Sequence, residues 1–229
     1  MADTTTTTPE GTAASTLAAR DGQDRPTTAL DALRVSPAAH LADLMAATEV
    51  TGERSVALRE LPFAVQLGLR AAPGSRSAEV LQEHFGLPLP SGVGEVSGDP
   101  AGQHLLWLGP DEFLAVDVSR RQEPGEADAP AAVLEGLPGQ VVDLSANRTI
   151  LVLSGASSRA VLEKGCHLDL HPAVFAVGTA VLTQLGPVPV ILHRTAEQEY
   201  RLYPRASFAD YMVRWLVDAM AEFAGEAVA

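Results

Sequence analysis

Four residues that can bind metals or carry out nucleophilic chemistry lie within six positions: Cys166, His167, Asp169 and His171. The two histidines would share a face only on a helix, where residues four apart are neighbours. The glycine that precedes Cys166 favours a helix end at that point, and the proline that follows His171 disfavours helical geometry there. We therefore predict a loop with no metal site.

Cys166 is the only cysteine of the chain, which excludes an intrachain disulfide. A thiol nucleophile needs a histidine base, and such pairs are normally assembled from distant segments. His84, His104 or His193 could supply that base, but no sequence pattern pairs one of them with Cys166. Free cysteines are among the most buried residue types, so a buried, inert thiol is the favoured interpretation.

The segment 143–148 (DLSANR) is the best candidate for a polar structural node. Asp143 and Asn147 can support a turn, because Asp and Asn side chains bond nearby backbone amides. Arg148 stands at the start of the next strand and can bind a carboxylate with both arms of its guanidinium. That carboxylate could be Asp143, a group on a partner or an anionic ligand. An ion pair within the chain or at an interface is favoured, because no second basic residue is near in sequence.

Nucleotide-binding motifs are missing from the sequence. The glycine-rich segment 91–98 (SGVGEVSG) is not followed by Lys-Ser or Lys-Thr, and no strand leads directly into it. The sequence therefore predicts no catalytic residue, no cofactor-binding residue and no metal ligand on this chain.

The charge balance excludes several classes of partner. The 229 residues carry a formal net charge of −13, which repels nucleic acid and anionic lipid. No apolar run approaches the roughly 20 residues that span a bilayer. The N-terminus has neither the basic start nor the apolar core of a secretion signal, so we expect a cytoplasmic protein.

The pattern of apolar residues and turns predicts the elements that must position these side chains. Residues 1–30 are poor in large apolar side chains and are expected to be a disordered tail, or alternatively a segment that folds against a partner. Residues 31–229 are expected to form one α+β domain of two similar halves, at about 50–140 and 141–223. Each half is predicted to be a small, mostly antiparallel sheet with helices packed on one face. Helices are expected at 31–47, 75–85, 129–137, 157–164 and 207–223, and strands at 56–58, 63–69, 104–108, 112–118, 141–144, 149–153, 180–185, 188–193 and 200–203. Turns at 109–111 and 186–187 predict two hairpins. Ser75 or Ser77 is expected to begin the helix at 75–85, and Gly86 to end it.

The last predicted helix has one wide apolar face. Its apolar side chains, Trp215 among them, recur at spacings of 3, 4, 7 and 8 residues. Ser207 is expected to cap its start, with Asp210 three residues later. Most of this face should pack on the chain's own sheet, and part of it could contact a partner.

Four segments resemble the gamma subunit of heterotetrameric sarcosine oxidase: WLGPDEFLAV (107–116), VDLSANR (142–148), LDLHP (168–172) and SFADYMVRWL (207–216). The resemblance implies an aminomethyltransferase-like fold, whose relatives bind folate. It also implies a complex that oxidatively demethylates sarcosine to glycine, releasing hydrogen peroxide and either formaldehyde or methylenetetrahydrofolate.

The resemblance implies a non-catalytic role in assembly with alpha, beta and delta subunits. FAD, FMN, NAD, tetrahydrofolate and zinc would be held by those other subunits. Asp143, Asn147, Arg148 and Trp215 are then candidates for structural or interface roles. The alternative is a stand-alone folate-binding protein of the same fold, acting in one-carbon metabolism.

Overall fold

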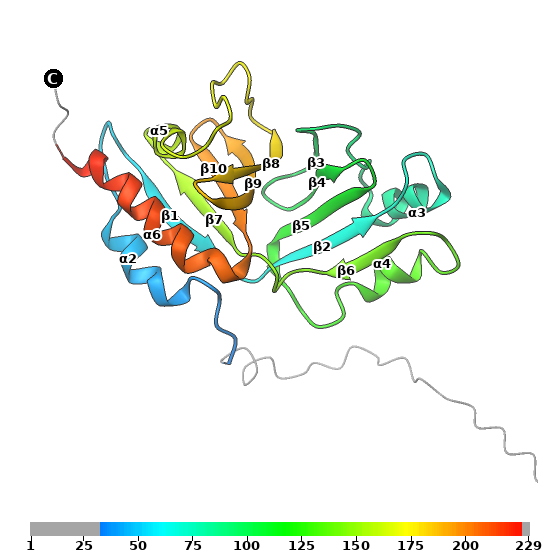
Figure 1. Ribbon diagram of the computed structural model, residues 1–229. Helices are drawn as coiled ribbons and strands as arrows, with labels where there is room; N and C mark the ends of the chain where they lie inside the picture. Colours follow the sequence, from blue (N-terminus) through cyan, green and yellow to red (C-terminus); the bar gives the residue numbers. More distant parts are fainter. Residues whose placement is uncertain (1–32, 226–229) are drawn as a thin grey trace, which may run out of the picture. The chain divides into compact units, whose positions relative to one another are not determined.

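Two five-stranded antiparallel sheets carry the fold in residues 33–225, the part of the chain that this computed structural model describes (Figure 1). The predicted tail, residues 1–30, lies outside the described residues. The first sheet has the order β3(Val96–Gly98), β4(Gln103–Gly109), β5(Glu112–Arg121), β2(Ala64–Arg70), β6(Gln140–Asp143). The second has the order β1(Ala57–Leu61), β7(Ile150–Ser154), β10(Glu199–Pro204), β9(Val188–Ala196), β8(Ala180–Leu185).

Both predicted hairpins are present. β4 and β5 pair in antiparallel register from Gln103 opposite Asp117 to Gly109 opposite Glu112. β8 and β9 pair down to Leu185 opposite Val188, so that only two residues form their turn. Gly186, the first of these, has φ +56°, a left-handed conformation that glycine adopts without steric cost.

Each sheet includes one edge strand from the other half of the sequence. β1 lies early in the sequence but pairs with β7 of the second sheet, and β6 pairs with β2 of the first. The strands expected at 141–144 and 149–153 lie on either side of a turn, as predicted, but they belong to different sheets. The segment between them passes from one sheet to the other, because Leu144 N–H continues the first sheet with a 2.8 Å bond to the Gln66 carbonyl. The division into halves at 50–140 and 141–223 remains a prediction.

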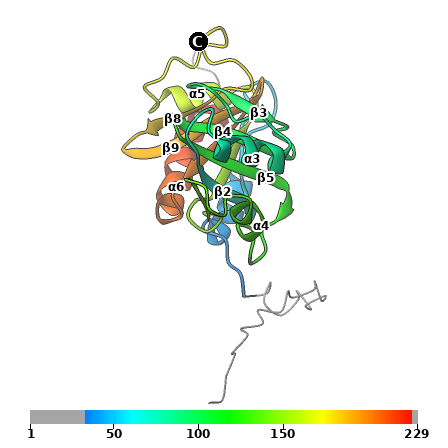
Figure 2. The same cartoon turned by 90° about the vertical axis from the view of Figure 1, so that its right-hand side faces the viewer.

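Helices lie against one face of each sheet (Figures 1 and 2). α3(Arg76–Phe85) and α4(Asp128–Ala132) pack on the first sheet, around buried residues such as Leu69, Leu81 and Leu105. α2(Ala42–Ala47), α5(Ser158–Glu163) and α6(Ala209–Met220) pack on the second sheet in a larger core. Short 3-10 turns, η1(Ala39–Leu41), η2(Ala206–Phe208) and η3(Ala221–Ala224), extend α2 and α6. The predicted α+β class is confirmed.

The helix ends test the capping predictions. Ser75 caps α3, since its side chain accepts a 3.2 Å bond from Ala78 N–H, and Gly86 ends that helix in the left-handed conformation. At the other predicted cap the expectation was wrong. Ser207 lies within η2, α6 begins after Phe208, and no side chain caps it. Asp210 instead binds Arg214 and His40.

A third apolar cluster joins the two sheets. It combines Leu106 and Leu114 of the first sheet with Ile150, Ile191 and Tyr203 of the second, all almost fully buried. These side chains lie on the sheet faces opposite the helices, because residues of a strand alternate between faces. The inter-sheet layer therefore fixes one sheet on the other.

Candidate functional site

The connection between β6 and β7 is a turn whose polar groups are engaged by the chain itself. One carboxylate oxygen of Asp143 accepts bonds from Ser145 N–H (2.9 Å) and Ser145 O–H (2.6 Å), and the other accepts one from the Gln122 amide (2.9 Å). The Ser145 hydroxyl in turn accepts a 2.9 Å bond from Gln66 N–H. Asp143 therefore shapes the turn and is not the partner of Arg148.

The second half of this turn forms hydrogen bonds with β2 of the first sheet and with the segment that follows β10 of the second. The Gln66 side-chain amide donates to the Arg148 carbonyl (3.0 Å), and Ala206 N–H donates to the Asn147 carbonyl (2.9 Å). Arg148 also faces Arg205 in an isolated antiparallel bridge. The structure thus brings Asn147 and Arg148 beside residues 205–206, a proximity that the sequence does not reveal.

Arg148 and Arg205, hereafter the arginine pair, have no ion-pair partner among the residues that the structure describes. The half-buried Arg148 guanidinium donates to the Tyr203 carbonyl at 3.0 Å. The pKa of Arg148 is lowered, first by burial and then by the charge of Arg205, while Glu112 opposes the shift. Two like charges are therefore held together without an ion pair to a described carboxylate, although Glu112 acts on Arg148 from a longer distance.

One flank of the last helix presents three aromatic residues, Phe208, Tyr211 and Trp215, hereafter the aromatic strip. They are spaced three and four apart, so they follow one line from the end of η2 along α6. Phe208 is 40% exposed and Tyr211 44%, while Trp215 is half-buried. The Trp215 ring lies on the backbone of Gly165, where an added Cβ would stand 2.5 Å from Cζ2 of the ring. Trp215 is thus partly a core residue and partly a surface one.

The segment of Cys166, His167, Asp169 and His171 is a loop, as predicted. Cys166 N–H bonds the Leu162 carbonyl at 2.8 Å, and the half-buried residue packs against the core of the second sheet. Asp169 accepts a 2.8 Å bond from His171 N–H, which is a local turn contact. His167 is exposed. Within the described residues, no group of three or more His, Cys, Asp or Glu side chains is placed to hold a metal ion.

Two buried histidines lie side by side, a proximity that the sequence does not predict. His104 of β4 and His193 of β9 are both fully buried in the inter-sheet layer, with ring centres 5.4 Å apart. The pKa of His104 is lowered to about 4 and that of His193 to about 3, chiefly by desolvation. The charge of Arg201 contributes to both shifts, and the neighbouring His104 contributes to that of His193. Both rings are neutral at neutral pH. The apolar runs 104–108 and 188–193 indicate that each histidine is buried. They do not indicate that the two histidines meet, because the runs form strands of different sheets.

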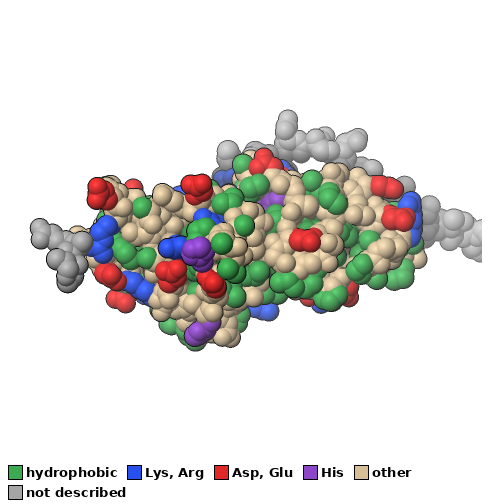
Figure 3. Space-filling model, turned by 90° about the horizontal axis from the view of Figure 1, so that it is seen from above, with side chains coloured by type: hydrophobic (Ala, Val, Ile, Leu, Met, Phe, Trp, Pro, Cys, Tyr) green, Lys and Arg blue, Asp and Glu red, His purple; other side chains and the backbone are tan. Residues whose placement is uncertain are grey.

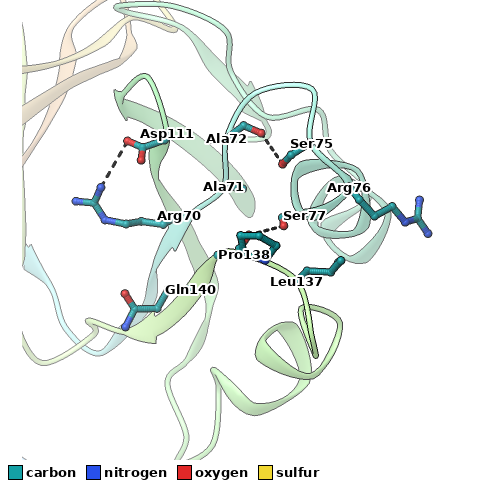
Figure 4. A pocket seen from close by; sticks show the side chains of 11 residues that line it. Arg70, Ala71, Ala72, Ser75, Arg76, Ser77, Asp111, Leu137, Pro138 and Gln140 are labelled. Atoms are coloured by element: carbon teal, nitrogen blue, oxygen red, sulfur yellow. Dashed lines mark hydrogen bonds and ion pairs between the residues drawn. The ribbon is translucent and has the colours of Figure 1, made fainter.

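A groove of about 500 Å³ lies at the start of α3 (Figure 4). Most of its polar side chains have partners: Arg70 pairs with Asp111, Ser75 donates to the Ala72 carbonyl, and Ser77 donates to the Pro138 carbonyl. The remaining polar side chain, the amide of Gln140, is neither a nucleophile nor a base. Arg76 points away from the groove in Figure 4 and pairs with Glu79 at 3.0 Å. The groove therefore presents no free nucleophile or base.

The molecular surface agrees with the charge balance of the sequence. On the face shown in Figure 3, Lys and Arg side chains lie scattered among acidic and apolar ones. The described residues of that face thus form no basic patch of the kind that binds nucleic acid. None of the described helices is long and apolar enough to cross a bilayer.

Comparisons with known proteins decide the family. A profile described as the sarcosine oxidase, gamma subunit family matches residues 69–222. The chain is 52% identical to the sarcosine oxidase subunit gamma of Corynebacterium sp. strain U-96 over 197 residues, which cover 86% of this chain and 95% of the relative. It is 49% identical to the corresponding subunit of an Arthrobacter species over the same lengths. This chain belongs to the sarcosine oxidase gamma subunit family.

The solved structures agree with that assignment. A chain of the heterotetrameric sarcosine oxidase from Corynebacterium sp. U-96, solved in complex with pyrrole 2-carboxylate, matches with a TM-score of 0.82 and 52% identity, covering 86% of this chain and 100% of that chain. The glycine cleavage system aminomethyltransferase T from Bartonella henselae matches with a TM-score of 0.52 and 17% identity, covering 77% of this chain and 48% of that chain. The second match shows a shared fold and confirms the aminomethyltransferase-like architecture expected for the family.

Proposed function

We propose that this chain is the gamma subunit of a heterotetrameric sarcosine oxidase. The observation that carries the proposal is the 52% identity and the TM-score of 0.82 over the whole length of a chain solved within that oxidase. The complex would oxidise the N-methyl group of sarcosine, giving glycine and hydrogen peroxide, with the methyl carbon released as formaldehyde or passed to tetrahydrofolate.

The role that we propose for the chain itself is assembly. The turn between the sheets is held by hydrogen bonds among Asp143, Ser145 and Gln66, so these groups are engaged within the chain. The groove at α3 presents no free reactive group. The described residues also offer no metal-ligand group, so they do not fit the zinc of the complex. FAD, FMN, NAD, tetrahydrofolate and zinc would accordingly belong to the alpha, beta and delta partners, and the complex would work in the cytoplasm.

The alternative, a stand-alone folate-binding protein, has only the shared fold with an aminomethyltransferase in its support. Affinity purification of the tagged chain from its native host distinguishes the two functions. We expect three further subunits and sarcosine-dependent hydrogen peroxide production in the purified material. Recovery of the chain alone, together with micromolar binding of tetrahydrofolate, would instead support the alternative.

A further inference from the structure

The arginine pair and the aromatic strip form one continuous surface. The Arg148–Arg205 bridge places the two arginines together, and Phe208 N–H bonds the Arg205 carbonyl at 2.9 Å. From Phe208 the strip continues along α6 to Tyr211 and ends where Trp215 lies on Gly165. Arginine and aromatic side chains are the types most enriched at the centres of protein interfaces.

Several exposed arginines of the described chain, such as Arg59 and Arg121, have no carboxylate ion pair, but Arg148 and Arg205 are the two that face each other in a bridge. Other exposed arginines have carboxylate partners, as shown by Arg70 with Glu112, Arg76 with Glu79, Arg120 with Glu126, and Arg214 with Asp210. The arginine pair has none among the described residues, although the chain carries 29 acidic residues against 16 basic ones. Two adjacent arginines without an ion pair, in a protein with this excess of carboxylates, form a surface complementary to an external carboxylate.

Burial strengthens the argument for Arg148. Its guanidinium is held by the Tyr203 carbonyl, so the donors on its remaining edge are oriented before any partner arrives. A preoriented guanidinium loses little side-chain entropy on binding and can hold a carboxylate with two parallel hydrogen bonds. Arg205 is exposed and adds charge beside it.

We propose that Arg148, Arg205, Phe208 and Tyr211, with Trp215 at the far end, form the surface on which another subunit of the oxidase docks. The partner presents a carboxylate to the arginine pair and an apolar surface to the aromatic strip. This inference rests on the proposed function, since it requires a partner subunit.

The test uses the tagged chain co-expressed with the other oxidase subunits of its host. Arg205→Glu and Tyr211→Ala each change an exposed side chain of the surface. Their matched controls are Arg76→Glu on α3, which makes the same change of charge, and Leu182→Ala on β8, where Leu182 is 51% exposed. We expect each surface variant to recover at least about tenfold less complex than wild type, while the controls recover wild-type amounts. Added salt should shrink the difference between Arg205→Glu and wild type, because salt screens the charge attraction that this variant removes.

Thermal unfolding of the free chain separates docking from folding. Arg205→Glu and Tyr211→Ala should leave its melting temperature within a few degrees of wild type. Arg148→Ala also loses the bond to the Tyr203 carbonyl. Its recovery of complex is therefore compared with wild type only if the two free chains have the same melting temperature. Full assembly by both surface variants would refute the docking surface but leave the proposed function intact. Failure of the wild-type chain to recover any subunit would refute both. A free chain that dimerises, with a dimer broken by the same variants, would replace the partner with a second copy.

Discussion

The buried histidine pair predicts a defined loss of stability in mild acid. His104 and His193 have pKa values of about 4 and about 3 in the folded protein, below the value of 6.5 for an unperturbed histidine. Between pH 6.5 and pH 4 the unfolded chain therefore binds two protons that the folded chain does not bind. Because the unfolded state binds more protons, the free energy of unfolding falls as the pH falls through this window.

The size of the effect follows from the fully buried positions of both rings. Each proton that only the unfolded chain binds lowers the free energy of unfolding by about 1.4 kcal/mol per pH unit. Each histidine therefore lowers this free energy by about 2 kcal/mol between pH 8 and pH 5, and the pair lowers it by about 4 kcal/mol. The nearby Arg201 stays charged throughout, and ordinary carboxylates titrate mainly below this window. The loss of stability due to the histidines should thus be distinguishable from general acid denaturation.

Urea unfolding at a series of pH values between 8 and 5 measures this loss. The double variant His104→Leu, His193→Leu should be nearly flat over the range, and the exposed His167→Leu control should follow wild type. Proton NMR of the folded protein should show both buried rings neutral at pH 5. A wild-type unfolding free energy that does not change from pH 7 to pH 5, or a double variant that keeps the two-proton slope, would refute the reasoning.

Three further substitutions test the packing and the absence of thiol chemistry. Gly165→Ala places a Cβ against the Trp215 ring and should cost about 1–3 kcal/mol of unfolding free energy. Gly102→Ala, whose added Cβ would stand 3.9 Å from the Asp99 carboxylate, should cost less than half as much, and equal costs would contradict the packing of Trp215 on Gly165. Ser75→Ala removes the cap of α3 and should cost about 1 kcal/mol by urea unfolding, and a neutral result would show that the bond to Ala78 contributes nothing. Cys166→Ser should leave sarcosine turnover of the reconstituted complex within about twofold, while a collapse of turnover in a fully assembled complex would assign the thiol a chemical role.

The features that the sequence predicted are the local ones. Ser75 and Gly86 mark the ends of α3 because capping depends on residues a few positions apart. The two-residue connection at Gly186 forces its strands to pair, for the same reason.

The features that the sequence missed depend on distant pairing. Nothing within β1 indicates that it pairs with β7, some ninety positions later, because an edge strand carries no signature of its neighbour. The expected cap at Ser207 failed because the contact of Arg205 with Arg148 and the bond of Ala206 to Asn147 set where the chain enters α6. The same long-range pairing places Arg148 beside Arg205, which the sequence separates by more than fifty residues.

The exchange of β1 and β6 between the sheets sets the order in which the chain can fold during synthesis. β1 has no strand partner until β7 has been made, and β2 keeps one open edge until β6 follows. The first sheet therefore cannot be completed before Asp143 has been synthesised, and the second sheet cannot be completed before Pro204. Pairings this distant in sequence slow folding, and an open strand edge invites pairing with other chains. The nascent chain is consequently most exposed to aggregation while its first 140 residues have been synthesised but their partner strands have not. We expect the two sheets of the finished chain to form and unfold as one cooperative unit.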